Sequence, residues 1–276
     1  GSVAFDRTVY PVPYGNVAGI SQFKTHATDA GTTGLAAGNV TVHVRVTDAD
    51  YNVSAMGEDV IKDTTVVIKI ERGSNSTTIA TVGDSVADQI VEVSPDSGVF
   101  EYDQTIGYNA GPTNSCPSTF NAGCVLQGDI LTVTYTDNYD ASGKSQTVTD
   151  SATFDLRNGV LQSDKSVYLI GSDMILTLIE PDFDLDNDGA QSLTLDLIEW
   201  DSDAATTTIK DQLSTFDPEP SELRETGDST GIFQVVLEIP ASISSENLDR
   251  GEKIDLEYTD WGPAGADYVG QEDEDI

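Results

Sequence analysis

Residues 40–47 read VTVHVRVT, an unbroken alternation of apolar and polar side chains. A period of two residues is that of a β-strand with one buried face. No window of helical length carries a period of 3.6 residues. The alternation recurs, in runs rich in Val, Ile, Thr and Tyr, at residues 65–70, 131–136, 193–197, 233–239 and 254–258. We therefore expect an all-β chain of many short strands, which is typical of β-sandwiches.

The strand pattern occurs twice, in the same order. Residues 8–10 (TVY) resemble residues 166–168 (SVY), and the acidic loop at residues 46–52 resembles the loop at residues 178–184. Two further pairs keep this order: Glu92 and Glu225, each six residues before a glycine, and Asp137 and Asp260, each closing a Tyr-Thr-Asp run. The repeat predicts two tandem immunoglobulin-like β-sandwich domains at residues 3–157 and 158–270, followed by an acidic linker at residues 271–276.

The charge of the chain excludes several partners. Its 276 residues include 48 acids and 13 bases, for a net charge of −35. Residues 1–157 hold 19 acids and 8 bases, net −11, whereas residues 158–276 hold 29 acids and 5 bases, net −24. Such a chain lacks the basic face that nucleic acid requires, and an anionic membrane surface would repel it. No apolar run approaches the ~18 residues of a membrane span, so we expect no direct membrane insertion in this segment.

Carboxylates at matched positions predict bound cations. Asp137 and Asp260 continue the core-facing side of their strands, where an unpaired carboxylate is very costly. Because bases are so few, a cation is the better partner. The sharpest signal is residues 184–189, DLDNDG, since alternate acids and a turn-forming glycine suit the flexible oxygen shell of Ca²⁺. It is not a complete EF-hand, because Leu195 stands where that motif has its bidentate Glu.

The predicted cofactor is therefore Ca²⁺, with Mg²⁺ less suited because it keeps more of its waters. The first-domain loop departs from the pattern after Asn52, so its site should be weaker. A solvated acidic loop, or adaptation to high salt, remains the alternative. The candidate ligands are Glu180, Asp182, Asp184, Asp186, Asp188, Glu225, Asp228 and Asp260 in the second domain, and Asp48, Asp50, Glu92 and Asp137 in the first.

Cysteines and glycosylation sequons favour an extracellular location. Cys116 and Cys124 lie in a loop rich in Asn, Gly, Pro and Ser that enlarges the first domain, and a disulfide between them is expected, with two free thiols as the alternative. Three N-x-[ST] sequons occur in the same domain, at Asn39, Asn52 and Asn75. A glycan on Asn52 would exclude its use as a metal ligand.

Nothing in the sequence indicates an enzyme. No nucleophile elbow, P-loop or dinucleotide fingerprint stands between a strand and a helix. Among 48 acids, a pair for glycoside hydrolysis can always be proposed, so that signal carries no weight. His26 and His43 are isolated and read as surface residues rather than as a zinc site.

Four segments resemble the surface-layer (S-layer) proteins of ammonia-oxidising archaea: residues 5–13 (FDRTVYPVP), 36–44 (AAGNVTVHV), 179–184 (IEPDFD) and 225–233 (ETGDSTGIF). The resemblance implies tandem immunoglobulin-like domains, secretion, glycosylation, bound divalent cations and assembly with other copies into a homo-oligomeric lattice. It also implies an acidic porous coat that concentrates ammonium, and that this chain is an internal segment of a longer protein. No catalytic residue carries over. The alternative is a calcium-dependent extracellular adhesin or carbohydrate-binding module, for which Trp261 beside Asp260 would be the aromatic contact.

Overall fold

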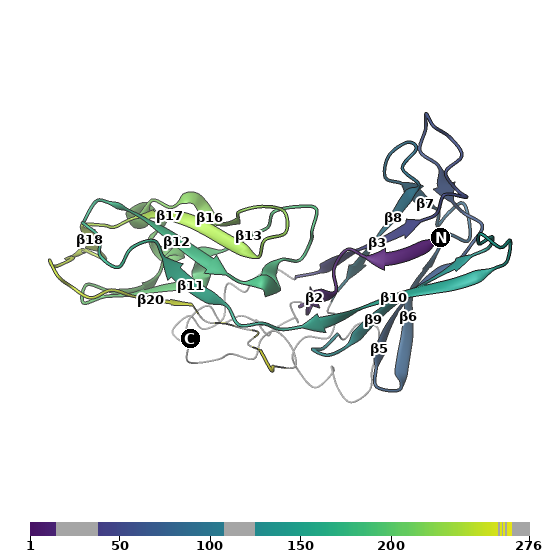
Figure 1. Ribbon diagram of the computed structural model, residues 1–276. Coiled ribbons are helices and arrows are strands. Elements are labelled where there is room, and N and C mark those ends of the chain that lie inside the picture. The colour runs from purple at the N-terminus through teal and green to yellow at the C-terminus, as the bar shows by residue number, and fades with distance from the viewer. Residues whose placement is uncertain (15–37, 108–124, 259, 261, 263, 267–276) are drawn as a thin grey trace. The chain divides into compact units, whose positions relative to one another are not determined.

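The computed structural model describes residues 1–14, 38–107, 125–258, 260, 262 and 264–266. These residues form a nearly all-β structure with several antiparallel sheets and one short α-helix (Figure 1). The chain divides into two compact units. The first contains residues 1–13 and 39–155, and the second contains the remaining described residues, from Leu156 onward together with Tyr14 and Gly38.

The first unit contains two five-stranded sheets. One has the order β1-β3-β8-β7-β4, with β1 at Ser2–Phe5, β3 at Val40–Thr47, β8 at Val99–Ile106, β7 at Ile90–Glu92 and β4 at Val60–Ile61. The other has the order β2-β10-β9-β5-β6, with β2 at Val9–Pro11, β10 at Gln146–Asp155, β9 at Ile130–Asp137, β5 at Val66–Arg72 and β6 at Asn75–Val82. All pairs are antiparallel except β2 with β10, which are parallel.

The core of the first unit follows the alternation in the sequence. Val40, Val42, Val44 and Val46 of β3 are fully buried, as are the alternate residues Leu131, Val133 and Tyr135 of β9. The two sheets contact each other where β1 lies against β9 and β10. Full burial of one such aliphatic side chain stabilises the fold by about 1.5–3 kcal/mol, so the period of two accounts for both the strands and their buried faces.

The second unit contains a five-stranded sheet, a three-stranded sheet and a two-stranded hairpin. The first has the order β11-β12-β17-β16-β13, with β11 at Val160–Ser163, β12 at Asp173–Ile179, β17 at Ile232–Glu238, β16 at Glu219–Glu225 and β13 at Ser192–Leu193. The second has the order β15-β14-β20, with β15 at Thr206–Thr208, β14 at Ile198–Asp201 and β20 at Asp255–Tyr258. The hairpin pairs β18 at Ser242–Ile243 with β19 at Glu246–Asn247.

Short helical turns occur only in the second unit among the described residues. They are three 3₁₀ turns, η1 at Pro181–Phe183, η2 at Leu195–Leu197 and η3 at Lys210–Gln212, and the α-helix α1 at Leu213–Phe216. The turn η2 contradicts the predicted strand at residues 193–197. Thr194 caps η2 by accepting a hydrogen bond from the N–H of Asp196. The apolar residues on both sides are buried in either geometry, so the alternation alone did not distinguish turn from strand.

Candidate metal centre

The second unit buries three carboxylates near the ends of its strands. Glu180 follows β12, Asp182 lies in η1 and Asp260 follows β20, and their exposed fractions are 1%, 3% and 2%. Pro181 opens η1, and the Glu180 side chain caps this turn by accepting the N–H of Asp182 at 3.2 Å. We call Glu180, Asp182 and Asp260 the buried acid cluster.

The chain passes close to this cluster at Gly159. The Gly159 N–H donates to Oδ2 of Asp260 at 2.8 Å, and the Gly262 N–H donates to its Oδ1 at 2.9 Å. The Tyr258 hydroxyl donates to Oε2 of Glu180 at 2.7 Å. A Cβ atom on Gly159 would lie 2.4 Å from that same Glu180 oxygen, so only glycine fits there.

Arg157 supplies a positive charge to the cluster. Its backbone N–H donates to Oδ2 of Asp182 at 2.7 Å, and its Nε lies 3.4 Å from Oδ1. One guanidinium nitrogen also donates to the carbonyl of Pro181 at 2.9 Å. The side chain is 39% exposed, so part of its charge remains in solvent. The half-exposed guanidinium thus pairs with Asp182, one of the three buried carboxylates.

The cluster holds protons more tightly than free carboxylates do. Burial raises the pKa of Glu180 well above its usual range, and the charges of Asp182 and Asp260 raise it further. Burial also raises the pKa of Asp182 to about 7, although the N–H and guanidinium of Arg157 act in the opposite direction. The chemical meaning is that the site favours added positive charge, which either a proton or a metal cation supplies.

The first unit has the same arrangement with fewer buried acids. The Tyr135 hydroxyl donates to Oδ2 of Asp48 at 2.6 Å, and the nitrogen of Gly1 donates to Oδ2 of Asp137. A Cβ on Gly1 would lie 2.5 Å from Oδ2 of Asp48, just as one on its counterpart would meet Glu180. Asp48 and Asp137 are 3% exposed, whereas Asp50 is an exposed residue. Two carboxylates are therefore buried here, against three in the second unit.

Glu225, another predicted ligand, is surrounded by backbone amides. Its Oε1 accepts the N–H groups of Thr230 and Gly231 at 2.7 and 2.8 Å, and its Oε2 accepts the N–H of Gln191 at 3.1 Å. Gly231 has φ of +59°, a conformation that favours glycine. Amides thus stabilise this buried carboxylate, and its role as a metal ligand stays a prediction.

Glu92 repeats this arrangement in the first unit. Its Oε1 accepts the N–H of Gly98 at 2.7 Å and the hydroxyl of Ser97 at 3.2 Å, and its Oε2 accepts the N–H of Asp59 at 3.0 Å. Gly98 has φ of +64°. These donors, led by the Asp59 N–H, lower the pKa of Glu92. In both units, the glutamate of the E-x-x-x-x-[ST]-G pattern therefore holds its loop by accepting backbone N–H groups. We call each such glutamate with its donors a loop clamp.

The acidic loop at residues 184–189 is separate from the buried cluster. Asp184 accepts from the hydroxyl of Ser229 at 3.3 Å, and Asp186 accepts from the N–H of Asp188 at 2.9 Å. Asp188 and Asp228 are exposed, whereas Asp184 and Asp186 are half-buried. Among the described residues, neither this loop nor the buried acid cluster brings three ligand atoms within 4.8 Å of one another. Calcium binding by the loop stays a prediction.

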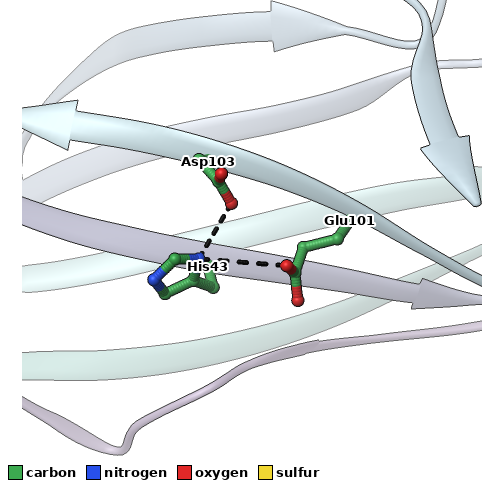
Figure 2. Close-up of side chains that lie close together, drawn as sticks. All are labelled: His43, Glu101 and Asp103. Carbon is green, nitrogen blue, oxygen red and sulfur yellow. Dashed lines mark hydrogen bonds and ion pairs between the residues drawn. The ribbon is translucent and has the colours of Figure 1, made fainter. Parts of the chain in front are cut away.

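A third acidic group lies on the first unit and was not predicted. Figure 2 shows His43 of β3 beside Glu101 and Asp103 of β8. The His43 Nδ1 lies 2.8 Å from Oδ1 of Asp103 and 4.0 Å from Oε1 of Glu101. Among the described residues, these three form the group whose ligand atoms all lie within 4.8 Å of one another. The group could hold a metal ion.

The register of β3 and β8 explains why these side chains meet. His43 pairs with Asp103, and Arg45 pairs with Glu101, so opposite charges face each other across the strands. Arg45 also forms an ion pair with Glu101, which competes with a metal for that carboxylate. The interpretation of His43 as a surface residue was wrong, since its exposed fraction is 2%. Only the strand register, which sequence does not provide, reveals the group.

The remaining predicted sites differ in what the structure describes. Cys116 and Cys124 lie outside the described residues, so the disulfide stays a prediction. Asn39 and Asn75 are exposed. Asn52 is half-buried, and its Oδ1 has no hydrogen-bond partner among the described residues. Both predicted uses of Asn52, glycan attachment and metal ligation, stay open.

No helix in the described part of the chain is long and apolar enough to cross a membrane. No protein-family model matches this chain. The search among curated proteins finds no match either. The function is therefore inferred from the geometry of the carboxylate groups and from the sequence motifs.

Proposed function

We propose that this chain is a structural segment of a secreted S-layer protein, and that Ca²⁺ bound at its carboxylates stiffens the domain ends. The observation that carries the proposal is the buried acid cluster, in which three carboxylates are at most 3% exposed beside one guanidinium. Tandem immunoglobulin-like folds, secretion and lattice assembly with other copies are proposed from the sequence repeat and the resemblance.

The chemistry of the cluster favours a divalent cation over protons alone. Burying a carboxylate without compensation costs several kcal/mol. One proton neutralises one carboxylate, whereas one divalent cation offsets two and also coordinates their oxygens. Ca²⁺ accepts about 6–8 oxygen ligands in a flexible geometry, while Mg²⁺ demands a stricter octahedron. Carboxylates on a 3₁₀ turn and two strand ends match the more tolerant ion.

The remaining acidity supports the second half of the proposal, enrichment of ammonium or other small cations. The net charge of −35 exceeds what a few bound Ca²⁺ ions would neutralise. Salt screens such a field over about 8 Å at physiological ionic strength. Enrichment therefore requires many acids lining one pore, which a lattice of copies would provide.

Calcium binding is tested by titration calorimetry on the chain, together with differential scanning calorimetry in Ca²⁺ or chelator. We expect saturable binding and a higher melting temperature, because a ligand at 100 times its Kd stabilises by about 2.7 kcal/mol. Asp182→Asn should reduce this response. Glu238→Gln, at an exposed end of β17, is the matched control that removes one charge away from the cluster.

Two results would count against calcium. One is the absence of both binding heat and a thermal shift in low-salt buffer. The other is an equal response of Asp182→Asn and Glu238→Gln, which would mean that Ca²⁺ acts only by screening the overall charge.

Assembly is tested separately by negative-stain electron microscopy with and without Ca²⁺. The S-layer proposal predicts ordered sheets in Ca²⁺ that disperse in chelator. A chain that binds Ca²⁺ but remains monomeric at high concentration would retain the metal site and lose the structural role.

The alternative, a calcium-dependent carbohydrate-binding module, requires an exposed aromatic ring beside the metal. Trp200 is fully buried, and Trp261 lies outside the described residues. The burial of Trp200 supports the structural role. If the protein bound glycans in a way that depends on both Ca²⁺ and Trp261, the carbohydrate-binding module would become the preferred function.

A further inference from the structure

A second group of possible metal ligands lies on the first unit, on the side of its sheet that faces away from the core. His43 belongs to the polar side of β3, opposite the buried valines of that strand. Glu101 and Asp103 lie on the same side of β8, because they pair with Arg45 and His43 across the two strands (Figure 2). The register of a regular antiparallel pair thus brings one nitrogen ligand and two oxygen ligands together.

The spacing of the three ligand atoms suits a single small cation. The His43 Nδ1 lies 2.8 Å from Oδ1 of Asp103 and 4.0 Å from Oε1 of Glu101, and all three atoms lie within 4.8 Å of one another. Zinc binds imidazole nitrogen and carboxylate oxygen at about 2.0–2.2 Å, which places neighbouring ligands of a tetrahedral ion roughly 3.3 Å apart. The two observed distances lie on either side of that value, so side-chain rotation alone would close the group around an ion.

The three side chains differ in exposure, and this difference gives the group an open side. The side chain of His43 is 3% exposed, that of Glu101 is 18% exposed and that of Asp103 is 61% exposed. The buried imidazole therefore provides a fixed ligand, whereas the exposed carboxylate can move to meet an ion that arrives from solvent. A zinc ion with three protein ligands keeps a fourth position for water, which solvent beside Asp103 would supply.

Asp6, directly after β1, anchors the backbone of His43. The His43 N–H donates to Oδ1 of Asp6 at 3.0 Å, and the His43 carbonyl accepts the N–H of Asp6 at 3.1 Å. The Asp6 side chain is 4% exposed, so its carboxylate adds a buried negative charge next to the imidazole-bearing residue. A ligand that is already held in place, in a negative field, lowers the free-energy cost of binding a cation.

The chemistry of these ligands selects a different ion from the one proposed for the buried acid cluster. That cluster offers carboxylate oxygens, which suit Ca²⁺. Imidazole nitrogen suits Zn²⁺ and its neighbours among the late first-row transition metals, whereas Ca²⁺ and Mg²⁺ take oxygen ligands. A His43 imidazole that lies against two carboxylates is therefore matched to a transition metal.

Arg45 is the cation that a metal would have to replace at Glu101. Its Nε forms an ion pair with Oε2 of Glu101, and its side chain is 49% exposed. An ion pair that is half in solvent is weak, so the guanidinium can turn to solvent when a divalent cation binds. A second arginine, Arg7, lies near Asp6, with its Nε 3.7 Å from Oδ2 of that residue. Arg45 is thus the direct competitor of a metal for one of the three ligands.

We propose that His43, Glu101 and Asp103 form a site for a late first-row transition-metal cation such as Zn²⁺, which joins the inner strands β3 and β8 of one sheet. The bound cation bridges the two strands through side chains and neutralises both carboxylates, while Arg45 is released to solvent. The site is independent of the calcium proposed for the buried acid cluster, since the two sites use different ligand types and belong to different units.

The site is tested with Zn²⁺ on the full chain carrying one histidine. The sequence holds two histidines, so His26→Gln leaves His43 as the only imidazole. Excess Ca²⁺ is present to fill the oxygen sites, and Zn²⁺ is added while nuclear magnetic resonance follows the ring protons of His43. We expect a saturable shift of these signals with Zn²⁺ and none with Ca²⁺ alone, because only a metal bound to the imidazole changes the ring directly.

A substitution at Asp103 tests one of the oxygen ligands. Asp103→Asn should weaken Zn²⁺ binding at least about tenfold, because loss of even an outer-shell partner costs a metal site about 10–100-fold in affinity. Asp84→Asn is the matched control, since it removes the same charge from an exposed position of the same unit and should leave the affinity nearly unchanged. Asp103 is mostly exposed, so its variant should fold, and thermal unfolding verifies this.

Arg45→Gln should act in the opposite direction. It frees Glu101 from its ion pair and should tighten Zn²⁺ binding by about two- to fivefold, the range that an exposed ion pair contributes. Arg224→Gln removes the same charge from an exposed position of the second unit, so it should have little effect on the His43 signals.

The proposal is overturned if Zn²⁺ leaves the His43 ring signals unchanged up to about 1 mM, the range of weak affinities. It is also overturned if Ca²⁺ shifts these signals as strongly, or if Asp103→Asn and Asp84→Asn bind Zn²⁺ equally well. An Arg45→Gln variant that binds Zn²⁺ no more tightly than Arg224→Gln would assign the group to a cross-strand ion-pair network and likewise reject the metal site.

Discussion

The two units share one hydrogen-bonding arrangement at their strand ends but differ in the number of carboxylates that it buries. In both, a tyrosine hydroxyl and a glycine nitrogen donate to the acids at the strand ends. They differ at Asp50, which is exposed, and Asp182, which is buried in η1. That one difference raises the number of buried carboxylates from two to three. We therefore expect the proposed cation site of the second unit to be the stronger of the two.

The units differ a second time in their sheets. The first unit places β10 between β2 and β9, whereas the second leaves the matching edge of β20 unpaired among the described residues. The buried acids at the strand ends are therefore held in both units, whether or not a described strand pairs with the neighbouring edge.

The largest expected effect comes from Gly159→Ala. The added Cβ would lie 2.4 Å from a Glu180 oxygen and 2.5 Å from the Tyr258 ring. We expect a loss of about 2–4 kcal/mol in the unfolding free energy of the second unit. Scanning calorimetry detects this loss as a lower melting temperature of that unit. Gly189→Ala is the control, because nothing lies within 4 Å of its added Cβ. Equal effects of the two substitutions would show that the acid cluster is not tightly packed.

The next effect tests whether the two loop clamps are equivalent. Glu92→Gln and Glu225→Gln each replace a carboxylate that accepts several N–H groups. Each should destabilise its own unit by about 1–3 kcal/mol, because a charged acceptor is lost and an amide NH₂ is placed against donors. Chemical denaturation followed by unit-specific hydrogen exchange measures both losses. A loss in only one unit would break the structural equivalence.

A pH series in chelator should separate the units further. Asp182 has a pKa of about 7 in the folded protein, above the ordinary value of 3.8, so the folded state retains a proton that the unfolded state has released. This stabilisation is complete below about pH 4 and is lost as the pH rises through about 7. The melting temperature of the second unit should fall between these limits, and that of the first should fall less.

Saturating Ca²⁺ should suppress this decrease, because the cation replaces the proton at the cluster. Scanning calorimetry at a series of pH values measures both transitions. If the first unit shows the larger decrease, the third buried acid does not control the difference.

The smallest effect is expected from Tyr135→Phe and Tyr258→Phe. Each removes one hydrogen bond to a buried carboxylate, at 2.6 and 2.7 Å. Each loss should be about 1 kcal/mol, read from the denaturant midpoint of the corresponding unit. A difference well above that size between the two variants would mean that the hydroxyls serve different roles.

Particular residues show how far the sequence could lead. Alternation predicted β3, β9, β17 and β20 closely, because a period of two reports directly on burial. The side-chain parity of Asp137 and Asp260 correctly predicted that both are buried. The prediction of a strand at residues 193–197 was wrong. Nothing in the sequence indicated that Asp182 is buried while Asp50 is exposed. Both depend on local turns whose geometry is decided by tertiary packing rather than by residue type.

The loops show the opposite limit. The DLDNDG motif drew attention to residues 184–189, yet the buried carboxylates lie just before it, at Glu180 and Asp182. The repeat also paired Glu92 with Glu225 as candidate metal ligands, without indicating that backbone amides would surround them. A motif reports which residue types are present, whereas solvent exclusion depends on the segments that pack over them.

The close passage of residues 157–159 through the acid cluster has a mechanical consequence. Tension applied along β10 reaches Arg157 and Gly159 within four residues, and both N–H groups are anchored on buried carboxylates. A cation that holds those carboxylates together would bear the applied force before the sheet of the second unit does. The second unit should then resist stretching more strongly in Ca²⁺ than in chelator, a difference that single-molecule force spectroscopy measures directly.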